Sequence, residues 1–247
     1  MTETTRFSNK VILITGAGSG IGRATSIKLA NLGASLALSD INLASVTETA
    51  AQCSTRTGQS HSTHEVDVSN TAAVDTFIAA VLTTHGRIDH IFNCAGVNPR
   101  SVNVSDTTDS YWATLIGVNL QGTFNICRAS IPHLRSGASI LNMSSMAGIR
   151  PSAGMSVYAA SKAGVIGLSK GLALELGPRG IRVNVVAPGD ICTATNAAVV
   201  AGQEEISAGR IALGRLGSPE EVADTVVFLF EGQFVNGSVV EVHGGLQ

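Results

Sequence analysis

The sequence predicts an α/β fold, a single domain in which helices cover both faces of a doubly wound parallel sheet of about seven strands. Short runs rich in Val, Ile and Leu alternate with stretches of helical spacing from residue 10 onward, which is the rhythm of a parallel sheet. A glycine-rich turn joins the first run to the first helix. No linker or low-complexity segment divides the 247 residues, so one domain is expected.

The elements follow one another in regular order. Apolar, β-branched runs predict strands over residues 10–15, 34–39, 60–66, 88–92, 138–143, 181–187 and 238–242. Helical spacing predicts helices over residues 23–32, 42–57, 70–86, 107–134, 158–176 and 219–230, the last capped by Ser218. Asn119 and Gly122 lie inside the long fourth helix, where both cost helix propensity, so a kink or a special contact is expected there.

Composition narrows the class of protein. Apolar residues make up 44% of the chain and charged residues 14%, and the net charge is −2. Without a cluster of Lys and Arg, neither nucleic acid nor an anionic membrane surface is an expected partner. The polar start does not resemble a signal peptide, and the four scattered cysteines suit reduced thiols. We therefore expect a cytoplasmic protein that acts on a small molecule.

The first strand leads into Gly16-Ala-Gly-Ser-Gly20-Ile-Gly22, which opens the first helix. Glycines let the backbone approach a pyrophosphate, and the helix N-terminus supplies free N–H groups, so this turn predicts a dinucleotide-binding (Rossmann) site. Asp40 ends the second strand, where a carboxylate can accept hydrogen bonds from an adenosine ribose. Asp40 is also a candidate N-cap for the helix that begins at Asn42, and the two roles are compatible.

Tyr158 and Lys162 stand four residues apart, so a helix through them would present both side chains on one face. A nearby ammonium favours the phenolate, so we expect Lys162 to lower the pKa of Tyr158 toward the working pH. A tyrosine tuned in this way can serve as a general acid or base. Ser145, one loop upstream, could hold the same substrate oxygen.

One cluster of side chains could be mistaken for a metal site. His61, His64, Glu65 and Asp67 are close in the sequence, but they lie along a predicted strand on which alternate side chains diverge. No metal site is expected.

Several motifs, in this order and spacing, resemble the short-chain dehydrogenase/reductase family over essentially the whole chain. They are Thr15-Gly-x-x-x-Gly20-x-Gly22, Asp67-Val68, Asn93-x-Ala-Gly96, Asn119, Ser145, Tyr158-x-x-x-Lys162 and Pro188-Gly-x-Ile-x-Thr193. Within the family, the chain looks like the 3-oxoacyl reductases and the secondary-alcohol dehydrogenases. The resemblance implies hydride transfer between NAD(H) and a secondary alcohol or ketone.

The resemblance also implies a role for each motif residue. Ser145 would hold the substrate oxygen and Tyr158 would transfer the proton. Lys162 would bind the nicotinamide ribose, and Asn119 would anchor a water that relays protons. The implied cofactor-binding residues are Gly16, Ser19, Gly20, Ile21, Gly22, Asp40, Asp67, Val68, Asn93, Ala95, Gly96, Tyr158, Lys162, Pro188, Gly189, Ile191 and Thr193.

NAD is expected in preference to NADP. The 2′-phosphate of NADP would meet Asp40, and residues 17–19, 41 and 42 offer no compensating cation. Arg23, the nearest cation, is expected to point away. Two alternatives stay open on the same fold, a non-redox enzyme such as a cyclase or isomerase and a cofactor-sensing protein.

Two departures from the family pattern concern the site and the assembly. Cys94 replaces a common asparagine, and a small local effect is expected. The loop at residues 231–237 is shorter than usual, so the expected homo-oligomer could be a tetramer or a dimer.

The expected substrate walls are residues 98–100, 148–156, 190 and 194–210, and a small substrate lid is expected at about residues 190–212. Arg100 and Arg150 are candidate contacts for an acidic substrate.

Overall fold

The computed structural model describes residues 6–55, 58–193 and 208–246. Seven parallel strands form one sheet in the order β3-β2-β1-β4-β5-β6-β7. The strands are β1 (Val11–Thr15), β2 (Ser35–Asp40), β3 (His61–Glu65), β4 (His90–Asn93), β5 (Ser139–Met143), β6 (Arg182–Pro188) and β7 (Val239–Val242). The predicted fold class is confirmed.

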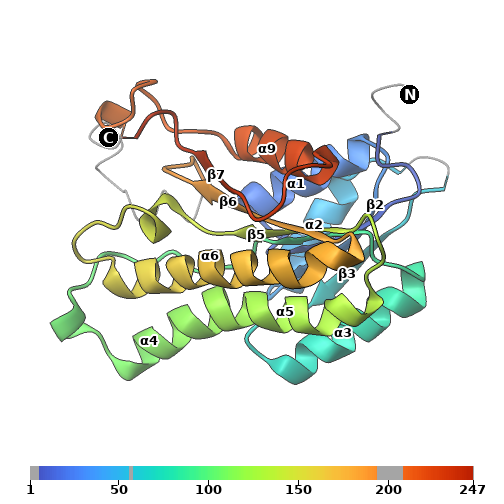
Figure 1. The fold of residues 1–247 in the computed structure, drawn as a ribbon, viewed down its shortest axis with the longest axis horizontal. Helices are drawn as coiled ribbons and strands as arrows, with labels where there is room; N and C mark the ends of the chain where they lie inside the picture. The colour runs from blue at the N-terminus through green and yellow to red at the C-terminus, as the bar shows by residue number, and fades with distance from the viewer. Residues whose placement is uncertain (1–5, 56–57, 194–207, 247) are drawn as a thin grey trace.

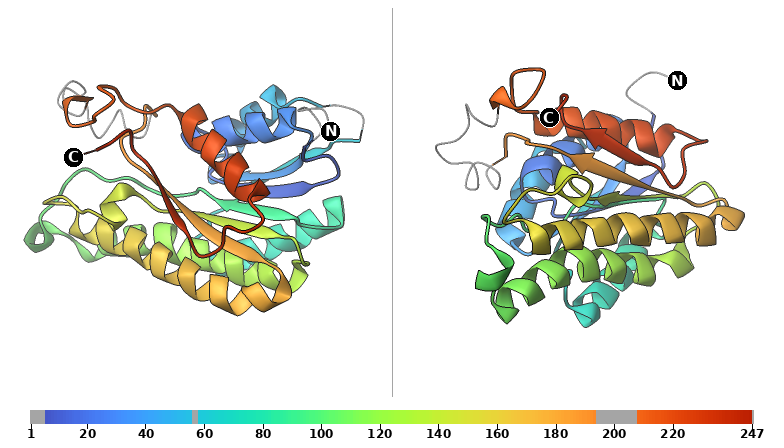
Figure 2. Two further views of the ribbon diagram at one scale, coloured as in Figure 1. Left: turned by 45° about the horizontal axis from the view of Figure 1, so that its top comes forward. Right: turned by 60° about the vertical axis from the view of Figure 1, so that its left-hand side comes forward.

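Helices cover both faces of this sheet (Figures 1 and 2). They are α1 (Gly20–Asn31), α2 (Leu43–Gln52), α3 (Thr71–His85), α4 (Asp109–Leu115), α5 (Gly122–Ser130), α6 (Ser156–Leu176) and α9 (Pro219–Glu231). In Figure 1, α1 and α9 lie above the sheet, whereas α3, α5 and α6 lie below it. Each layer therefore buries the apolar stripe of its helices against one face of the sheet.

The alternation of side chains along β1 shows how the two cores arise. Ile12 and Ile14 point into the core that contains α1 and α9, whereas Leu13 points into the core that contains α3, α5 and α6. All five residues of the strand are buried. A strand covered on both faces needs apolar residues at every position, which is why this run is continuous rather than alternating.

The helix expected over residues 42–57 is shorter than predicted. It begins at Leu43, after the N-cap Asn42, whose side chain accepts a hydrogen bond from the Ser45 N–H. It ends at Gln52, because Cys53 takes an extended conformation and buries its side chain in the core. Residues 56–57 lie outside the described part of the chain.

The long helix expected over residues 107–134 is interrupted. It begins at Asp109, and a π-helical segment, Ile116–Gln121, separates α4 from α5. Asn119 lies in that segment and is fully buried. The predicted irregularity at Asn119 is confirmed, and π-helical turns of this kind are frequent at functional sites.

The amino end of α9 agrees with the predicted cap. The Ser218 side chain accepts a hydrogen bond from the Glu221 N–H, and the Glu221 carboxylate accepts one from the Ser218 N–H. This reciprocal capping box satisfies two N–H groups that would otherwise lack helical partners.

The pairing register of the parallel strands aligns the carboxyl ends of β2, β1, β4 and β5. Thr15 pairs with Ser39 on one side and with Asn93 on the other, and Asn93 pairs with Asn142. In open parallel sheets, ligands bind at this edge. Within the described residues, no helix combines the length and apolar character needed to cross a membrane.

Candidate active site

A cavity of about 490 Å³ opens at the carboxyl ends of the strands. The motif residues that line it are Gly16, Ser19, Gly20, Ile21, Gly22, Asp40, Asp67, Val68, Ala95, Gly96, Ser145, Tyr158, Lys162, Pro188, Gly189, Ile191 and Thr193. Asn93 and Asn119 do not line it and are buried. One cavity therefore brings together the dinucleotide motifs and the Ser-Tyr-Lys set.

The glycine-rich turn lines the cavity and lies beside Asp40. Gly16 and Gly20 have φ angles of 66° and 49°, in the left-handed region that favours glycine. Ser19 is the N-cap of α1, but its side chain makes no capping hydrogen bond. The first turn of α1 therefore has no side-chain cap from Ser19 and lines the cavity through Gly20, Ile21 and Gly22, where its N–H groups could meet an anion.

The Asp40 carboxylate holds the glycine-rich turn by hydrogen bonding. Its Oδ2 accepts a hydrogen bond from the Gly18 N–H at 2.9 Å, and its Oδ1 accepts one from the Asn42 N–H at 3.1 Å. The suggestion that Asp40 caps the second helix is wrong, because Asn42 is the N-cap. The Asp40 carboxylate is instead fixed beside the glycine-rich turn, on the cavity wall.

The prediction that Arg23 points away from the turn is wrong. Its guanidinium folds back and donates to the Gly18 carbonyl at 2.6 Å, to Thr49 Oγ1 at 3.0 Å and to Glu48 Oε2 at 3.0 Å. The Arg23 side chain points toward the turn because the free Gly18 carbonyl and the Glu48 carboxylate on α2 both attract a cation. Arg23 supports the outer side of the turn, and Glu48 offsets its charge.

A buried network of hydrogen bonds joins the polar side chains of Asn93, Asn142 and Ser169 near the cavity. Asn93 Nδ2 donates to Asn142 Oδ1 at 2.8 Å, and Asn142 Nδ2 donates to Ser169 Oγ at 2.8 Å. This chain of hydrogen bonds joins β4 and β5 to α6. Asn93 thus lies beneath the cavity, at the strand end where the resemblance had placed it.

Cys94 replaces asparagine at the cavity wall. Its N–H donates to Thr15 Oγ1, which also accepts the Ala95 N–H, so the strand end keeps a polar anchor. Burial raises the pKa of the Cys94 thiol to about 12, so the side chain is neutral at physiological pH.

Asn119 uses the π-helical segment to reach the site. Its Oδ1 accepts the Val97 N–H at 2.8 Å, and its Nδ2 donates to Val97 O and to Ser161 Oγ. The Ser161 hydroxyl in turn donates to the Tyr158 carbonyl at 2.7 Å. Asn119 therefore ties the loop after β4 to the first turns of α6.

Tyr158 and Lys162 lie on one face of α6, as their spacing predicts. The Lys162 ammonium lies 5.8 Å from the centroid of the Tyr158 ring and donates to the Met143 carbonyl at 3.2 Å. Lys162 is only 4% exposed. Burial lowers its pKa to about 8, because the low-dielectric surroundings disfavour the charged form.

The expected lowering of the Tyr158 pKa is wrong for the protein as described. Burial raises that pKa above its ordinary value, and a hydrogen bond with Ser145 offsets only part of the rise. Burial prevails because a phenolate in this enclosed position would lose its hydration. Burial also lowers the pKa of Lys162, so its ammonium is less available to stabilise a phenolate at high pH.

Several residues predicted as substrate walls line the cavity, and we call the part that they line the substrate end. Of the predicted walls, Asn98, Arg150, Ser152, Met155, Asp190 and Arg210 line it, whereas Arg100 does not. Residues 194–207, which make up most of the predicted lid, lie outside the described part of the chain. The sequence did not predict Val97, Met146 or Leu246 as wall residues. Leu246 lacked any signal, since it reaches the cavity only through the turn after β7.

Comparison with known proteins shows extensive similarity. A family described as enoyl-(acyl carrier protein) reductase matches residues 16–247. The chain is 38% identical over 245 residues to the 3-oxoacyl-[acyl-carrier-protein] reductase FabG of Thermotoga maritima, covering 98% of this chain and 99% of the relative. It is 39% identical over 258 residues to the (3R)-3-hydroxyacyl-CoA dehydrogenase of Canis lupus familiaris, covering 100% and 99%.

Solved structures share the fold over nearly their full length. One is titled short-chain dehydrogenase/reductase SDR:glucose/ribitol dehydrogenase from Brucella melitensis, with a TM-score of 0.93, 29% identity and 99% coverage of both chains. A short chain dehydrogenase from Burkholderia cenocepacia in complex with NADP has a TM-score of 0.91, with 33% identity and coverage of 97% and 98%. The 3-ketoacyl-(acyl-carrier-protein) reductase from Brucella melitensis complexed with NADH has a TM-score of 0.88, with 29% identity and coverage of 96% and 98%.

Proposed function

The chain belongs to the short-chain dehydrogenase/reductase family, and we propose that it transfers hydride between NAD(H) and a secondary alcohol or ketone, with Tyr158 as acid or base. As a member of this family it is an oxidoreductase that uses a nicotinamide cofactor and acts on a small molecule. The two relatives reported above are named as a reductase and a dehydrogenase, which does not favour the cyclase, isomerase or sensor alternatives.

The proposal depends on one observation, the single cavity that joins the Asp40 end to the Ser145-Tyr158-Lys162 end. The residues present fit a dinucleotide. A Cβ atom added at Gly96 would lie 3.2 Å from the Lys162 ammonium and 3.1 Å from Asn119 Oδ1, so a larger residue there would crowd both groups. Asp40 at one end of the cavity and Lys162 at the other can each bind ribose hydroxyls. The glycine-rich turn between them can bind a pyrophosphate.

Each catalytic side chain has a proposed task. When bound, the nicotinamide supplies or accepts the hydride. The Ser145 hydroxyl holds the substrate oxygen, and the Tyr158 hydroxyl gives that oxygen a proton or takes one from it. Lys162 holds the nicotinamide ribose, and Asn119 anchors a water that relays protons to Lys162. The other motif residues that line the cavity are proposed to bind the cofactor. Among them, Thr193 is proposed to contact the carboxamide of the nicotinamide.

NAD preference is part of the proposal. The Asp40 carboxylate would repel the 2′-phosphate of NADP by about 1 kcal/mol in water and about 4 kcal/mol at an effective dielectric constant near 20, for charges roughly 4 Å apart. Arg23 lies at the same turn, but Glu48 offsets its charge and Gly18 and Thr49 accept its N–H groups, so we propose that it compensates a 2′-phosphate only weakly. NADP and NADH each occur with a related structure, so the choice rests on this chain's own residues.

The deciding experiment compares kcat/KM for NADH and NADPH across a panel of ketones, on the wild type, Asp40→Asn and Asp40→Ala. Wild type should favour NADH at least ~10-fold. Asp40→Asn keeps an acceptor for the Gly18 N–H without the charge, so it should shrink the ratio with little loss of stability. Equal efficiency with both cofactors in the wild type would overturn the NAD assignment. Absence of turnover with every ketone and alcohol would overturn the oxidoreductase assignment.

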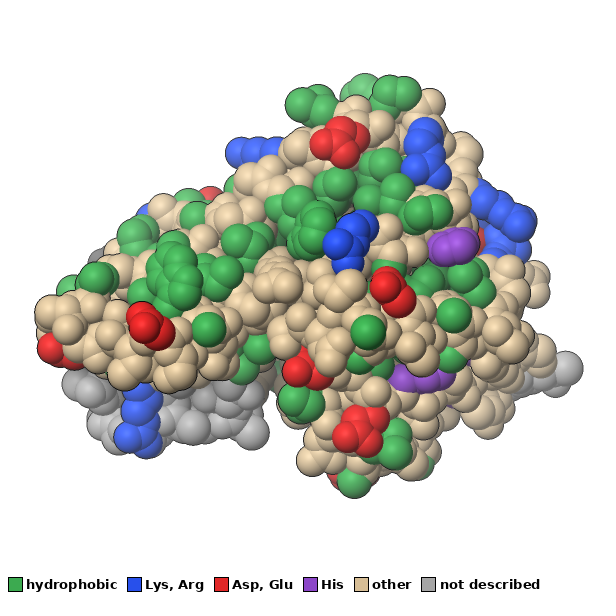
Figure 3. Space-filling model, turned by 90° about the horizontal axis from the view of Figure 1, so that it is seen from below, with side chains coloured by type: hydrophobic (Ala, Val, Ile, Leu, Met, Phe, Trp, Pro, Cys, Tyr) green, Lys and Arg blue, Asp and Glu red, His purple; other side chains and the backbone are tan. Residues whose placement is uncertain are grey.

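We also propose a homo-oligomer, a dimer or a tetramer. Large apolar side chains remain exposed on two sides of the molecule, with Trp112, Phe124 and Leu174 on α4, α5 and α6 and with Phe228 and Phe234 on and after α9. Figure 3 views the molecule from below, and patches of hydrophobic side chains occupy that face. Light scattering on the eluting protein decides between one, two and four copies.

A further inference from the structure

The turn after β7 closes one wall of the substrate end. Leu246 lines the cavity, as Arg150 does on the opposite loop. The turn also pairs with the described segment at residues 211–213, through hydrogen bonds from the Ala212 N–H to Gly245 O and from the Leu213 N–H to Gly244 O, both 3.1 Å. Residues 243–246 are therefore anchored to this segment by backbone hydrogen bonds.

His243 anchors the same turn from the inside. Its Nδ1 accepts the Gly245 N–H at 3.1 Å and the Leu246 N–H at 2.7 Å. Because both partners are donors, Nδ1 carries no proton, and the ring proton of the neutral side chain lies on Nε2. Nε2 then donates to Glu241 Oε2 at 3.2 Å. This tautomer follows from the two backbone donors alone.

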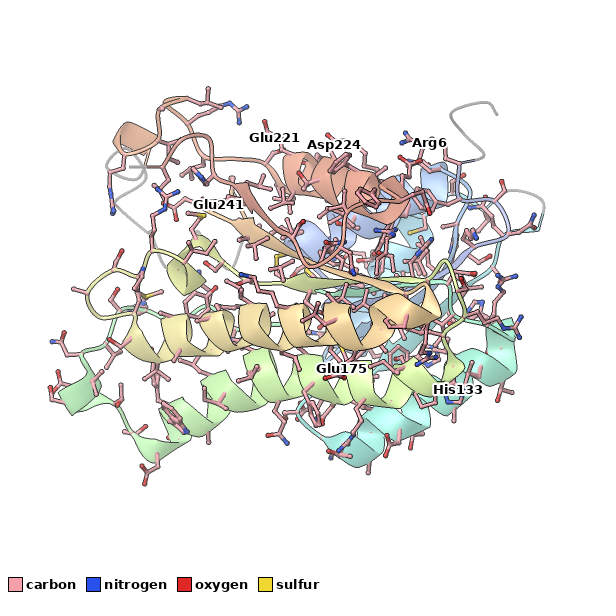
Figure 4. The ribbon with its side chains drawn as sticks, viewed as in Figure 1. Arg6, His133, Glu175, Glu221, Asp224 and Glu241 are labelled. Carbon is pink, nitrogen blue, oxygen red and sulfur yellow. The ribbon has the colours of Figure 1, made fainter. Side chains whose placement is uncertain are left out.

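Glu241 links this turn to the loop after β5. Its Oε2 also accepts a hydrogen bond from the Arg150 guanidinium at 2.8 Å, and Arg150 donates to the Leu246 carbonyl at 3.5 Å. Figure 4 shows Glu241 on β7, above the amino-terminal half of α6. Half-exposed ion pairs contribute little alone, so His243 is the main side-chain support of Leu246, beside the backbone hydrogen bonds from Ala212 and Leu213. The pairing does, however, neutralise Arg150 at the cavity wall.

We infer that His243 is a positioning residue that holds Leu246 in the substrate wall, and that Leu246 sets the size of the apolar, uncharged substituent the site accepts. The inference rests on the proposed function. Val97, Met146 and Met155 line the cavity with Leu246, so these four side chains offer an apolar surface beside the polar wall residues Asn98, Ser152 and Asp190. The Glu241 carboxylate beside Arg150 weakens the attraction of that guanidinium for a carboxylate on the substrate.

The test uses Leu246→Ala, His243→Ala and the matched control His133→Ala, whose histidine is exposed and lies away from this cavity. Ketones with a methyl, propyl or branched apolar group, and one with a terminal carboxylate, are compared by kcat and KM. Hydrogen exchange of the Gly245 and Leu246 amides is measured on the same proteins. The affinity for NADH is measured by calorimetry as a check on the opposite end of the cavity.

Leu246→Ala should raise the kcat/KM ratio of branched to methyl ketone by ~10-fold, mainly through KM. His243→Ala should shift the ratio the same way and speed exchange at both amides by at least ~10-fold, since each loses its acceptor. His133→Ala should change neither, and NADH affinity should stay within about twofold in all variants.

An unchanged ratio in Leu246→Ala, or unchanged exchange in His243→Ala, would overturn the inference. So would a wild-type preference for the carboxylate ketone that disappears in Arg210→Gln, which would make the exposed Arg210 the determinant instead. If no ketone is turned over, the proposed function fails, and the exchange experiment still decides whether His243 holds the turn.

Discussion

Tyr158 is the residue on which the chemistry depends. Tyr158→Phe keeps the ring and its packing but removes the only group assigned to move a proton at the substrate oxygen, so turnover should fall by ~10²–10⁴. NADH affinity, measured by calorimetry, should barely change. Tyr111→Phe is the matched control, since Tyr111 is the other tyrosine of the chain and does not line the cavity. Retention of more than a tenth of the wild-type rate would contradict the assignment.

The order of the two pKa values at the site leads to a second prediction. Burial lowers the pKa of Lys162 to about 8 and raises that of Tyr158 above its ordinary value of 10.0. In the free protein, Lys162 therefore becomes neutral before Tyr158 ionises. Phenolate absorbance of the wild type minus that of Tyr158→Phe should rise only above pH 10, and Lys162→Met should leave this rise unshifted.

The same substitution should behave differently in the working enzyme. Lys162→Met removes the proposed ribose contact, so it should weaken NADH binding as well as slow turnover. If the phenol titrates well below pH 10 in the free wild type and moves upward in Lys162→Met, the sequence-based interpretation of the Tyr-Lys pair would hold after all.

At the scale of elements, the amino end of α5 packs against Val68, which lines the cavity. A Cβ added at Gly122, the first residue of α5, would lie 2.5 Å from Val68 Cγ2, and Val68 lines the cavity. Gly122→Ala should therefore displace Val68, destabilise the fold by about 1–3 kcal/mol and weaken NADH binding.

Gly117 provides the matched control inside the π-helical segment. A Cβ there would lie 3.7 Å from Ser69 Cβ, an ordinary van der Waals distance, so Gly117→Ala should be tolerated. Urea unfolding and calorimetry with NADH, run on both variants, separate the two cases. Equal stability of the two variants would show that α5 can shift away from Val68 without cost.

The sequence predicts the positions of residues within elements better than the contacts between loops. Tyr158, Lys162 and Asp40 line one cavity, which motif order could anticipate because each follows from its spacing within an element or from the end of a strand. The inward fold of Arg23 and the place of Leu246 were not predictable, since both depend on which loops the sheet brings together. The pKa of Tyr158 was misjudged because spacing reveals a neighbouring charge but not the depth of burial.

For the whole molecule, stability should depend on pH through His90. This side chain on β4 stacks on Phe230 of α9, at 4.9 Å between ring centroids, and its Nδ1 is buried without a partner. Burial lowers its pKa from 6.5 to about 4, and Asp89 opposes that shift only partly. The residue therefore joins the central sheet to the last helix in its neutral form.

The sign of the effect follows from the two states. Between pH 6.5 and 4 the unfolded chain binds a proton at His90 that the folded chain does not, so the free energy of unfolding falls as the pH falls. The contribution is fully present above about pH 6.5 and is lost toward pH 4, by roughly 3 kcal/mol for a shift of this size. His64 and His85, whose pKa values burial also lowers, act in the same direction.

A difference between variants isolates the part due to His90. His90→Phe keeps an aromatic ring against Phe230 but cannot titrate, so its free energy of unfolding in urea should fall less steeply from pH 6.5 to 4 than that of the wild type. His133→Phe, at an exposed position, should keep the wild-type slope. Identical slopes for wild type and His90→Phe would mean that His90 accepts its proton in the folded state, and that the contact between β4 and α9 tolerates a charge.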